Sequence, residues 1–166
     1  MDSTYISTPL GTAFIQGSEA GITRLTVGSE RPVSDQVPVS LKPVYRQLKA
    51  YFEGHLREFD IPLSPQGTDF QKKVWKALME IPFGRTISYG EIAAGLGNPG
   101  AVRAVASANA QNPIWILIPC HRVVGTDGDL RGYAGGLHRK QWLLNHESEA
   151  YQYSLFPGGQ TAERDL

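Results

Sequence analysis

The stretch SYGEIAAGLGNPGAVRAVASAN, residues 88–109, carries the clearest local structure signals in this chain of 166 residues. Ser88 followed three positions later by Glu91 is a capping box, the usual start of a helix, and Gly97 is placed to end that helix. Residues 100–109 predict a second short helix, rich in alanine and valine. Two short helices around a glycine-containing turn are typical of a helix-turn-helix, although an ordinary helical hairpin has the same spacing.

The segments around this stretch predict further elements of a mostly helical unit. Upstream, Thr68 and Gln71 form another capping box, followed by an apolar face that indicates a helix. Downstream, the apolar run over residues 114–119 predicts a strand that leads directly to Cys120, and residues 137–146 predict a last helix.

The first part of the chain has the pattern of a small antiparallel sheet with one helix. Residues 5–6, 13–15 and 22–27 are short β-type runs punctuated by glycine, and residues 44–52 place apolar side chains on one helical face. Pro62 and Pro65 mark a linker. We therefore predict an N-terminal α+β domain over residues 1–64, a second domain over residues 67–155, and a flexible tail over residues 156–166.

Composition places the chain among soluble globular proteins, with 41% hydrophobic and 19% charged residues. No apolar run approaches the roughly 20 residues of a membrane span, and the first residues lack the pattern of a signal peptide. The expectation is a reducing, intracellular protein without a membrane partner. The net charge is zero, and residues 67–150 are only mildly basic, with nine Lys/Arg against seven Asp/Glu.

Cys120 is the only cysteine, which excludes an internal disulfide and a multi-cysteine zinc site. No metal site and no cofactor is predicted. A single cysteine is more often buried filler than a reactive group. His121 follows it directly, and a thiol needs such a base to become a nucleophilic thiolate. Neighbours on a strand point to opposite faces, so contact between the two requires a turn or a bridging water, and Pro119 favours a turn.

The run Ile118-Pro119-Cys120-His121-Arg122-Val123-Val124 resembles the active-site signature of O6-alkylguanine-DNA alkyltransferases. Four further motifs follow the order of that family, and the resemblance covers roughly residues 67–149. They are Asn112-Pro113, Tyr133-Ala134-Gly135-Gly136-Leu137, Trp142-Leu143-Leu144-Asn145-His146-Glu147, and the two halves of the helix-turn-helix, Ser88-Tyr89-Gly90-Glu91-Ile92-Ala93 and Ala101-Val102-Arg103-Ala104-Val105.

The resemblance implies a fold and an activity. The N-terminal α+β domain would be ribonuclease-H-like with an antiparallel sheet, and the C-terminal domain would be a helical, winged helix-turn-helix unit that binds DNA and transfers alkyl groups. The activity would be DNA repair by single-turnover transfer of the alkyl group from O6-alkylguanine, and from O4-alkylthymine, to Cys120. The partner would be double-stranded DNA with that lesion, acted on by a monomer without an obligate protein partner, in the cytoplasm or, in a eukaryotic source, the nucleus.

The resemblance also implies roles for the catalytic residues. Cys120 would accept the alkyl group, and His121 would draw its proton through a water molecule. Glu147 would hold His121 in the productive tautomer, as a carboxylate does in other sets of nucleophile, base and orienting group. Asn112 would brace the active-site turn, and Tyr89 would offer its hydroxyl to the base.

DNA contact and the pocket are assigned in the same way. Arg103 would fill the gap that a flipped nucleotide leaves in the duplex. Val123 and Tyr133 would line the base pocket. Four residues stand where relatives contact the DNA backbone: Asn98, Gly90, Gln71 and Thr126.

Two residues depart from the pattern of the family. Trp115 replaces a small residue or proline beside the pocket, where its ring would narrow the space, stack on an aromatic alkyl group, or point into the core. Asn109 replaces an apolar pocket wall.

Three alternatives to alkyl transfer stay open: an alkyltransferase-like lesion binder, which would lack the cysteine; a helix-turn-helix regulator, which would need a more polar second helix; and a cysteine hydrolase, which would turn over.

Overall fold

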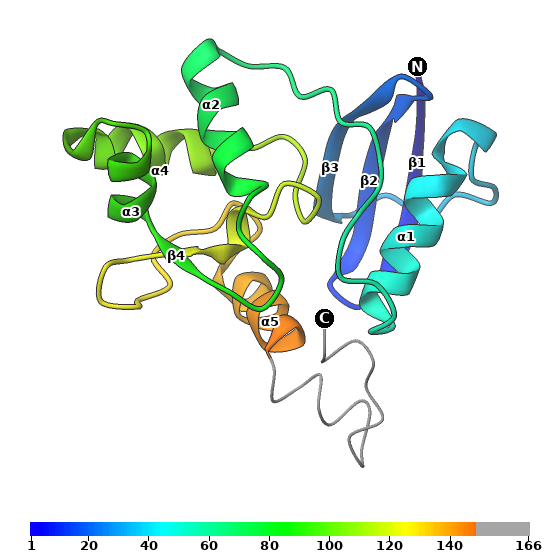
Figure 1. The fold of residues 1–166 in the computed structure, drawn as a ribbon. Helices are drawn as coiled ribbons and strands as arrows, with labels where there is room; N and C mark the ends of the chain where they lie inside the picture. Colours follow the sequence, from blue (N-terminus) through cyan, green and yellow to red (C-terminus); the bar gives the residue numbers. More distant parts are fainter. Residues whose placement is uncertain (149–166) are drawn as a thin grey trace.

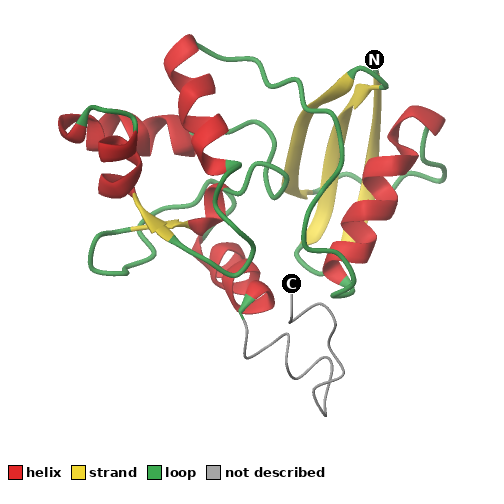
Figure 2. Ribbon diagram, in the orientation of Figure 1, coloured by secondary structure: helices red, strands yellow, loops and turns green. Residues whose placement is uncertain are grey.

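The computed structural model describes residues 1–148 of the chain. The sheet and helix α1 form one part of the molecule, and helices α2 to α5 form the other (Figure 1). The mixed α+β fold with an N-terminal antiparallel sheet and a helical second part confirms the predicted class (Figure 2). The domain limits stay a prediction, and the predicted tail over residues 156–166 lies outside the described residues.

The N-terminal sheet is the predicted meander. Its strands are β1 (Asp2–Thr8), β2 (Gly11–Ser18) and β3 (Gly21–Ser29), paired antiparallel in that order. Alternation along the strands buries Ile6, Ile15 and Leu25 on one face. A short turn of 3₁₀ helix, η1 (Val39–Leu41), leads into α1 (Lys42–Phe52), whose apolar stripe of Val44, Leu48 and Tyr51 is buried.

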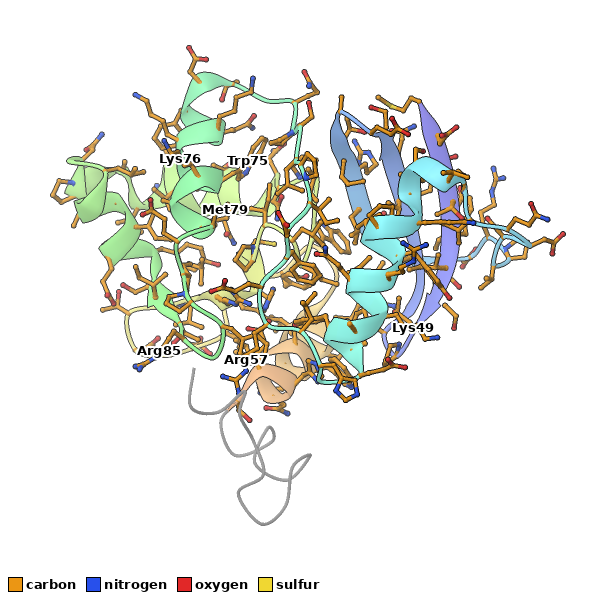
Figure 3. The ribbon with its side chains drawn as sticks, turned by 45° about the vertical axis from the view of Figure 1, so that its right-hand side comes forward. Lys49, Arg57, Trp75, Lys76, Met79 and Arg85 are labelled. Carbon is orange, nitrogen blue, oxygen red and sulfur yellow. The ribbon has the colours of Figure 1, made fainter. Side chains whose placement is uncertain are left out.

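The free edge of β3 joins the two parts of the molecule. The backbone of Ile22 exchanges hydrogen bonds with residues 62 and 64, in the segment predicted as a linker. Further along β3, the Leu25 amide donates to the carbonyl of Pro113, and the Trp115 amide donates to the carbonyl of Leu25. Side chains fill the space between the two ribbons (Figure 3), and buried apolar residues of both parts form one continuous core.

The second part contains the predicted helix-turn-helix. Both capping boxes are formed, by Thr68 and Gln71 at the start of α2 (Asp69–Leu78) and by Ser88 and Glu91 at the start of α3 (Tyr89–Gly95). A 3₁₀ turn, η2 (Pro99–Ala101), leads into α4 (Val102–Ala110). The strands β4 (Ile87–Ser88) and β5 (Val123–Val124) pair in parallel, and α5 (Leu137–Glu147) ends the described chain.

The prediction of a strand over residues 114–119 is wrong. The backbone turns there, with Ile116 at a positive φ of 73° and isolated bridges in place of a ladder. Ile114, Leu117 and Ile118 are nonetheless buried. The apolar run therefore identified burial correctly, but hydrophobicity without alternation does not define the backbone conformation.

Candidate active site

Cys120 is the first residue of a 3₁₀ turn, η3 (Cys120–Arg122), that follows Pro119. Asn112 ties this turn to the segment before it, because its Nδ2 donates to the carbonyl of Ile118 at 2.8 Å while its Oδ1 accepts from the amide of Ile114 at 2.9 Å. Asn109 on α4 approaches from the other side, with Nδ2 3.4 Å from the carbonyl oxygen of Cys120. The nucleophile candidate thus has its backbone fixed by two buried amide side chains.

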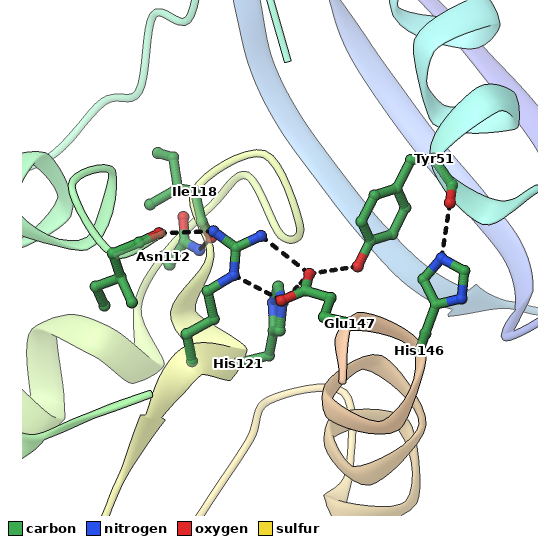
Figure 4. Close-up of polar contacts among 8 residues, drawn as sticks. Tyr51, Asn112, Ile118, His121, His146 and Glu147 are labelled. Carbon is green, nitrogen blue, oxygen red and sulfur yellow. Dashed lines mark hydrogen bonds and ion pairs between the residues drawn. The ribbon is translucent and has the colours of Figure 1, made fainter. Parts of the chain in front are cut away.

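His121 and Glu147 form a buried pair at the end of α5 (Figure 4). The imidazole Nε2 donates to Oε2 of Glu147 at 2.8 Å. Burial alone would raise the pKa of the Glu147 carboxyl, but His121 and Arg122 hold that pKa well below its usual range. An ionised Glu147 keeps the proton on Nε2 of His121, so Nδ1 carries the lone pair. Nδ1 is buried and makes no hydrogen bond within residues 1–148.

The Cys120 side chain is only 3% exposed, and burial raises the pKa of its thiol to about 11. Asn112, Lys140 and Tyr133 offset part of that burial effect. The resting residue is therefore a neutral thiol, which reacts only when a base removes its proton. His121 is the next residue in the chain and carries the lone pair on Nδ1, so it is the candidate base for this thiol.

A cavity of about 550 Å³ opens beside Cys120. Its walls come from α3, from α4 and from the loop after β5, and include Tyr89, Arg103, Thr126 and Tyr133. Burial raises the pKa of the Tyr89 and Tyr133 hydroxyls, so both are neutral hydrogen-bond donors. The cavity can therefore hold a planar, polar group with its reacting atom at the thiol.

Two residues expected in the pocket lie behind its wall. Val123 is fully buried in β5, and Trp115 packs against Tyr133 with ring centroids 5.7 Å apart. The indole Nε1 of Trp115 donates to the carbonyl of Asn112 at 3.1 Å. Neither residue lines the cavity, whereas Asn109 does. Trp115 can thus influence the pocket through its contacts with Tyr133 and Asn112.

The residues expected to contact DNA differ in their exposure and in the elements that carry them. Arg103 is exposed on α4, and Asn98 and Thr126 are exposed in the turn and in the loop after β5. Gly90 lies beside Thr126, because a Cβ built on Gly90 would come within 3.9 Å of the Thr126 hydroxyl oxygen. Gln71 is half-buried, and its side-chain oxygen accepts the amide of Thr68 in the capping box.

Sequence reasoning missed two residues of the site. Lys140 on α5 is fully buried, and its ammonium donates to the carbonyls of Val123 at 2.6 Å, Gly132 at 3.1 Å and Leu130. Burial lowers the pKa of Lys140 to about 8. Tyr51 donates its hydroxyl to Glu147 across the two parts of the molecule. The apolar periodicity of α1 indicated that Tyr51 is buried, but nothing in the sequence indicated its polar partner.

Two further buried side chains support this part of the site. Arg122 donates to both oxygens of Glu147. His146 is also buried, with Nε2 donating to the carbonyl of Tyr51 at 2.7 Å. The reason is that α5 turns this side of its last turn toward α1, which its sequence alone does not reveal.

Within residues 1–148, no group of three or more His, Cys, Asp or Glu side chains is arranged to hold a metal ion. In the same part of the chain, none of the helices has the length and apolar character that crossing a membrane requires.

Comparison with known families matches both parts of the chain. Residues 1–65 match the model of the ribonuclease-like domain of 6-O-methylguanine DNA methyltransferase, and residues 69–149 match the model of its DNA-binding domain. The methylated-DNA–protein-cysteine methyltransferase of Methanosarcina barkeri is 48% identical over 151 residues, covering 86% of this chain and 94% of the relative. The protein of the same name from Mycobacterium tuberculosis H37Rv is 48% identical over 147 residues, covering 86% and 89%.

Solved structures give the same result. The crystal structure of Mycobacterium tuberculosis O6-methylguanine methyltransferase superposes with a TM-score of 0.81 at 43% identity, covering 96% of each chain. A crystal structure of Mycobacterium tuberculosis OGT in complex with DNA superposes with a TM-score of 0.78 at 44% identity, covering 92% of this chain and 98% of that one. The chain therefore belongs to the 6-O-methylguanine DNA methyltransferase family, which confirms the resemblance found in the sequence.

Proposed function

We propose that this protein repairs DNA by moving the alkyl group of O6-alkylguanine, and of O4-alkylthymine, onto Cys120 once per molecule. The observation that carries the proposal is the arrangement of a buried neutral thiol at a cavity, next to an imidazole whose Nε2 is held by an ionised carboxylate. The matched relatives are named as methyltransferases that act on methylated DNA with a protein cysteine as acceptor, and DNA is the partner in one neighbouring structure.

The reaction is a displacement at a saturated carbon. The thiol proton of Cys120 passes through a water molecule to Nδ1 of His121, and the sulfur then forms a bond to the alkyl carbon while the bond from that carbon to guanine O6 breaks. The released guanine gains a proton from the Tyr89 hydroxyl, which lines the same cavity, and Tyr89 is reprotonated from His121. The products are an unmodified guanine and a thioether, which water does not cleave. The protein is consumed in the reaction.

DNA binding follows from the position of the helix-turn-helix beside the cavity. An alkyl group on O6 points into the stacked duplex, so the nucleotide must leave the stack to reach Cys120. Arg103 is exposed on α4 and also lines the cavity, so its planar cation is placed to occupy the gap. The small residues Ala106 and Ala110 on the same helix allow close approach of DNA. Four positions are proposed to contact the DNA backbone: Asn98, Gly90, Gln71 and Thr126.

We further propose that the protein acts as a monomer, in the cytoplasm or in the nucleus of a eukaryotic source. One monomer holds the nucleophile, the base and the cavity in a single chain. No second copy is therefore needed to complete the site.

Intact-mass measurement tests the proposed reaction. Excess duplex DNA with O6-methylguanine should add one methyl mass per protein, located on Cys120, while Cys120→Ala should bind the duplex and gain no mass. Repair beyond one equivalent of lesion would contradict the single-turnover mechanism and favour a hydrolase. Binding without mass gain in the wild-type protein would favour an alkyltransferase-like lesion binder.

A further inference from the structure

Tyr51 connects the N-terminal sheet domain to the carboxylate of the active site. Its hydroxyl donates to Oε2 of Glu147 at 2.6 Å, although the two residues are 96 positions apart (Figure 4). Its backbone carbonyl accepts from Nε2 of His146 at 2.7 Å. One residue of α1 is therefore bound to two consecutive residues of the last turn of α5, and it is fully buried while doing so.

The hydroxyl of Tyr51 shares one oxygen of Glu147 with the base candidate. Oε2 accepts from Tyr51 Oη at 2.6 Å, from His121 Nε2 at 2.8 Å and from Arg122 Nη2 at 3.0 Å, whereas Oε1 accepts from Arg122 Nε at 2.7 Å. Two other titratable groups interact electrostatically with the Glu147 carboxylate. They are His146 on α5 and Tyr133 in the loop after β5. Burial and Glu147 raise the pKa of Tyr51 well above its usual value, so the hydroxyl stays a donor at any working pH.

We propose that Tyr51 is a positioning residue for the Cys120 relay: its hydroxyl fixes the Glu147 oxygen that orients His121 and withdraws part of the negative charge of that oxygen. The N-terminal domain then contributes a side chain to the reactivity of the cysteine. The link to repair rests on the proposed function, but the link to thiol reactivity does not, because any soft electrophile that reaches Cys120 reports on the relay.

The hydrogen bond from the Tyr51 hydroxyl predicts how the relay changes when that hydroxyl is removed. When Tyr51 becomes Phe, the shape of the side chain is kept and Oε2 of Glu147 loses one donor. The carboxylate then presents more negative charge to His121, which stabilises the charged ion pair that forms when His121 takes the proton of Cys120. The pH profile of Cys120 alkylation is therefore expected to move upward.

The experiment measures the alkylation rate of Cys120 by iodoacetamide as a function of pH. Cys120 is the only cysteine, so intact mass gives the extent of reaction without ambiguity. Tyr45→Phe is the matched control, because Tyr45 is half-buried on the same helix and its hydroxyl has no part in the Glu147 contacts. For Tyr51→Phe, we expect the midpoint of the acid limb to rise by about 0.5–1 pH unit, the size expected for one charge-assisted hydrogen bond in a buried network. Tyr45→Phe should keep the wild-type midpoint.

The midpoint separates a positioning role from a structural one. The folded fraction of each variant is measured alongside, because an unfolded chain exposes Cys120 as an ordinary thiol with a pKa of about 8.5. Between equally folded proteins, an unchanged midpoint in Tyr51→Phe would overturn the proposal whatever the rate. A second series with free O6-benzylguanine should show the same displacement of the acid limb. If the iodoacetamide profile moves but neither protein reacts with the alkylguanine, the proposed function fails while the role of Tyr51 in the relay stands.

Discussion

Replacing Arg122 with methionine removes the two-point ion pair that holds the buried carboxylate of Glu147. Arg122 is only 7% exposed, and its guanidinium donates to both oxygens of Glu147 and, at 2.8 Å, to the carbonyl of Ile81. Methionine has a similar length but no donor. In the variant, Glu147 keeps Tyr51 and His121 as donors, and the Ile81 carbonyl loses its side-chain partner.

The expected cost follows from this geometry. Breaking a buried ion pair by removing one partner costs about 3–5 kcal/mol, because the remaining charge is left in a poor environment. Two donors to Glu147 remain, so we expect the lower end of that range, about 3 kcal/mol in the free energy of unfolding at pH 7. An exposed ion pair contributes only about 0–1 kcal/mol. We expect a larger contribution here because the pair of Arg122 and Glu147 is bidentate and buried.

The cost should also depend on pH. The folded-state pKa of Glu147 is depressed, so its contribution to stability is present above the unfolded pKa of about 4.3 and is lost as the pH falls through the folded value. Without Arg122 that depression is smaller. The unfolded carboxyl titrates alike in both proteins, so the difference in stability between wild type and Arg122→Met should stay constant from pH 6 to about 4.3 and narrow only below that pH.

Urea unfolding followed by tryptophan fluorescence measures both effects. Arg131→Met is the control, because Arg131 forms loose ion pairs with Asp127 and Asp129, at 3.6 and 3.9 Å, that are more than half exposed. That variant should unfold within about 1 kcal/mol of wild type. If Arg122→Met is also within about 1 kcal/mol at pH 7, or if the difference grows in acid, the buried pair does not stabilise the fold as argued.

Three further predictions concern other parts of the site. Arg103→Ala should slow repair of duplex DNA far more than transfer from free O6-benzylguanine, which needs no flipping; equal losses in the two rates would mean that Arg103 supports the pocket. Trp115→Ala should let Tyr133 recede and raise the ratio of benzyl to methyl transfer by about tenfold at most, and an unchanged ratio would make Trp115 a core residue only. Because the folded-state pKa of Lys140 is lowered to about 8, the unfolded state binds more protons than the folded state between pH 8 and about 10. Thermal unfolding should therefore show the stability of wild type rising relative to that of Lys140→Met across this interval. A stability difference that does not change with pH would contradict the lowered pKa.

Local signals in the sequence were sufficient for most of the fold. The hydrogen bonds of the capping boxes at Thr68 and Ser88 could be predicted from the sequence, because the donor and the acceptor of each bond are only three residues apart. The alternation in residues 13–15 and 22–27 likewise defines one buried face. The run over residues 114–119 failed for a physical reason: a segment buried on all sides has no periodicity, and Ile116 adopts a positive φ that its side chain disfavours.

The residues of the site also divide into those that the sequence indicated and those that it did not. Cys120 and His121 are neighbours in the chain, and the family resemblance supplied Glu147 at the end of the last helix. The missed residues, Tyr51 and Lys140, act through contacts between distant segments. A tyrosine in an apolar stripe and a lysine on a helix are ordinary in sequence, and only the packing of α1 against α5, and of α5 against the loop after β5, turns them into polar partners.

The burial of the Cys120 thiol affects how long the protein keeps this thiol intact before it reacts. A protein that reacts once cannot recover an acceptor lost to peroxide or to a stray electrophile. Oxidation and alkylation of cysteine both proceed through the thiolate and require access, and here the sulfur is nearly inaccessible and its pKa is raised to about 11. Under the proposed function, the burial of the sulfur and its low thiolate content should therefore slow the loss of the acceptor to oxidation before a lesion is bound.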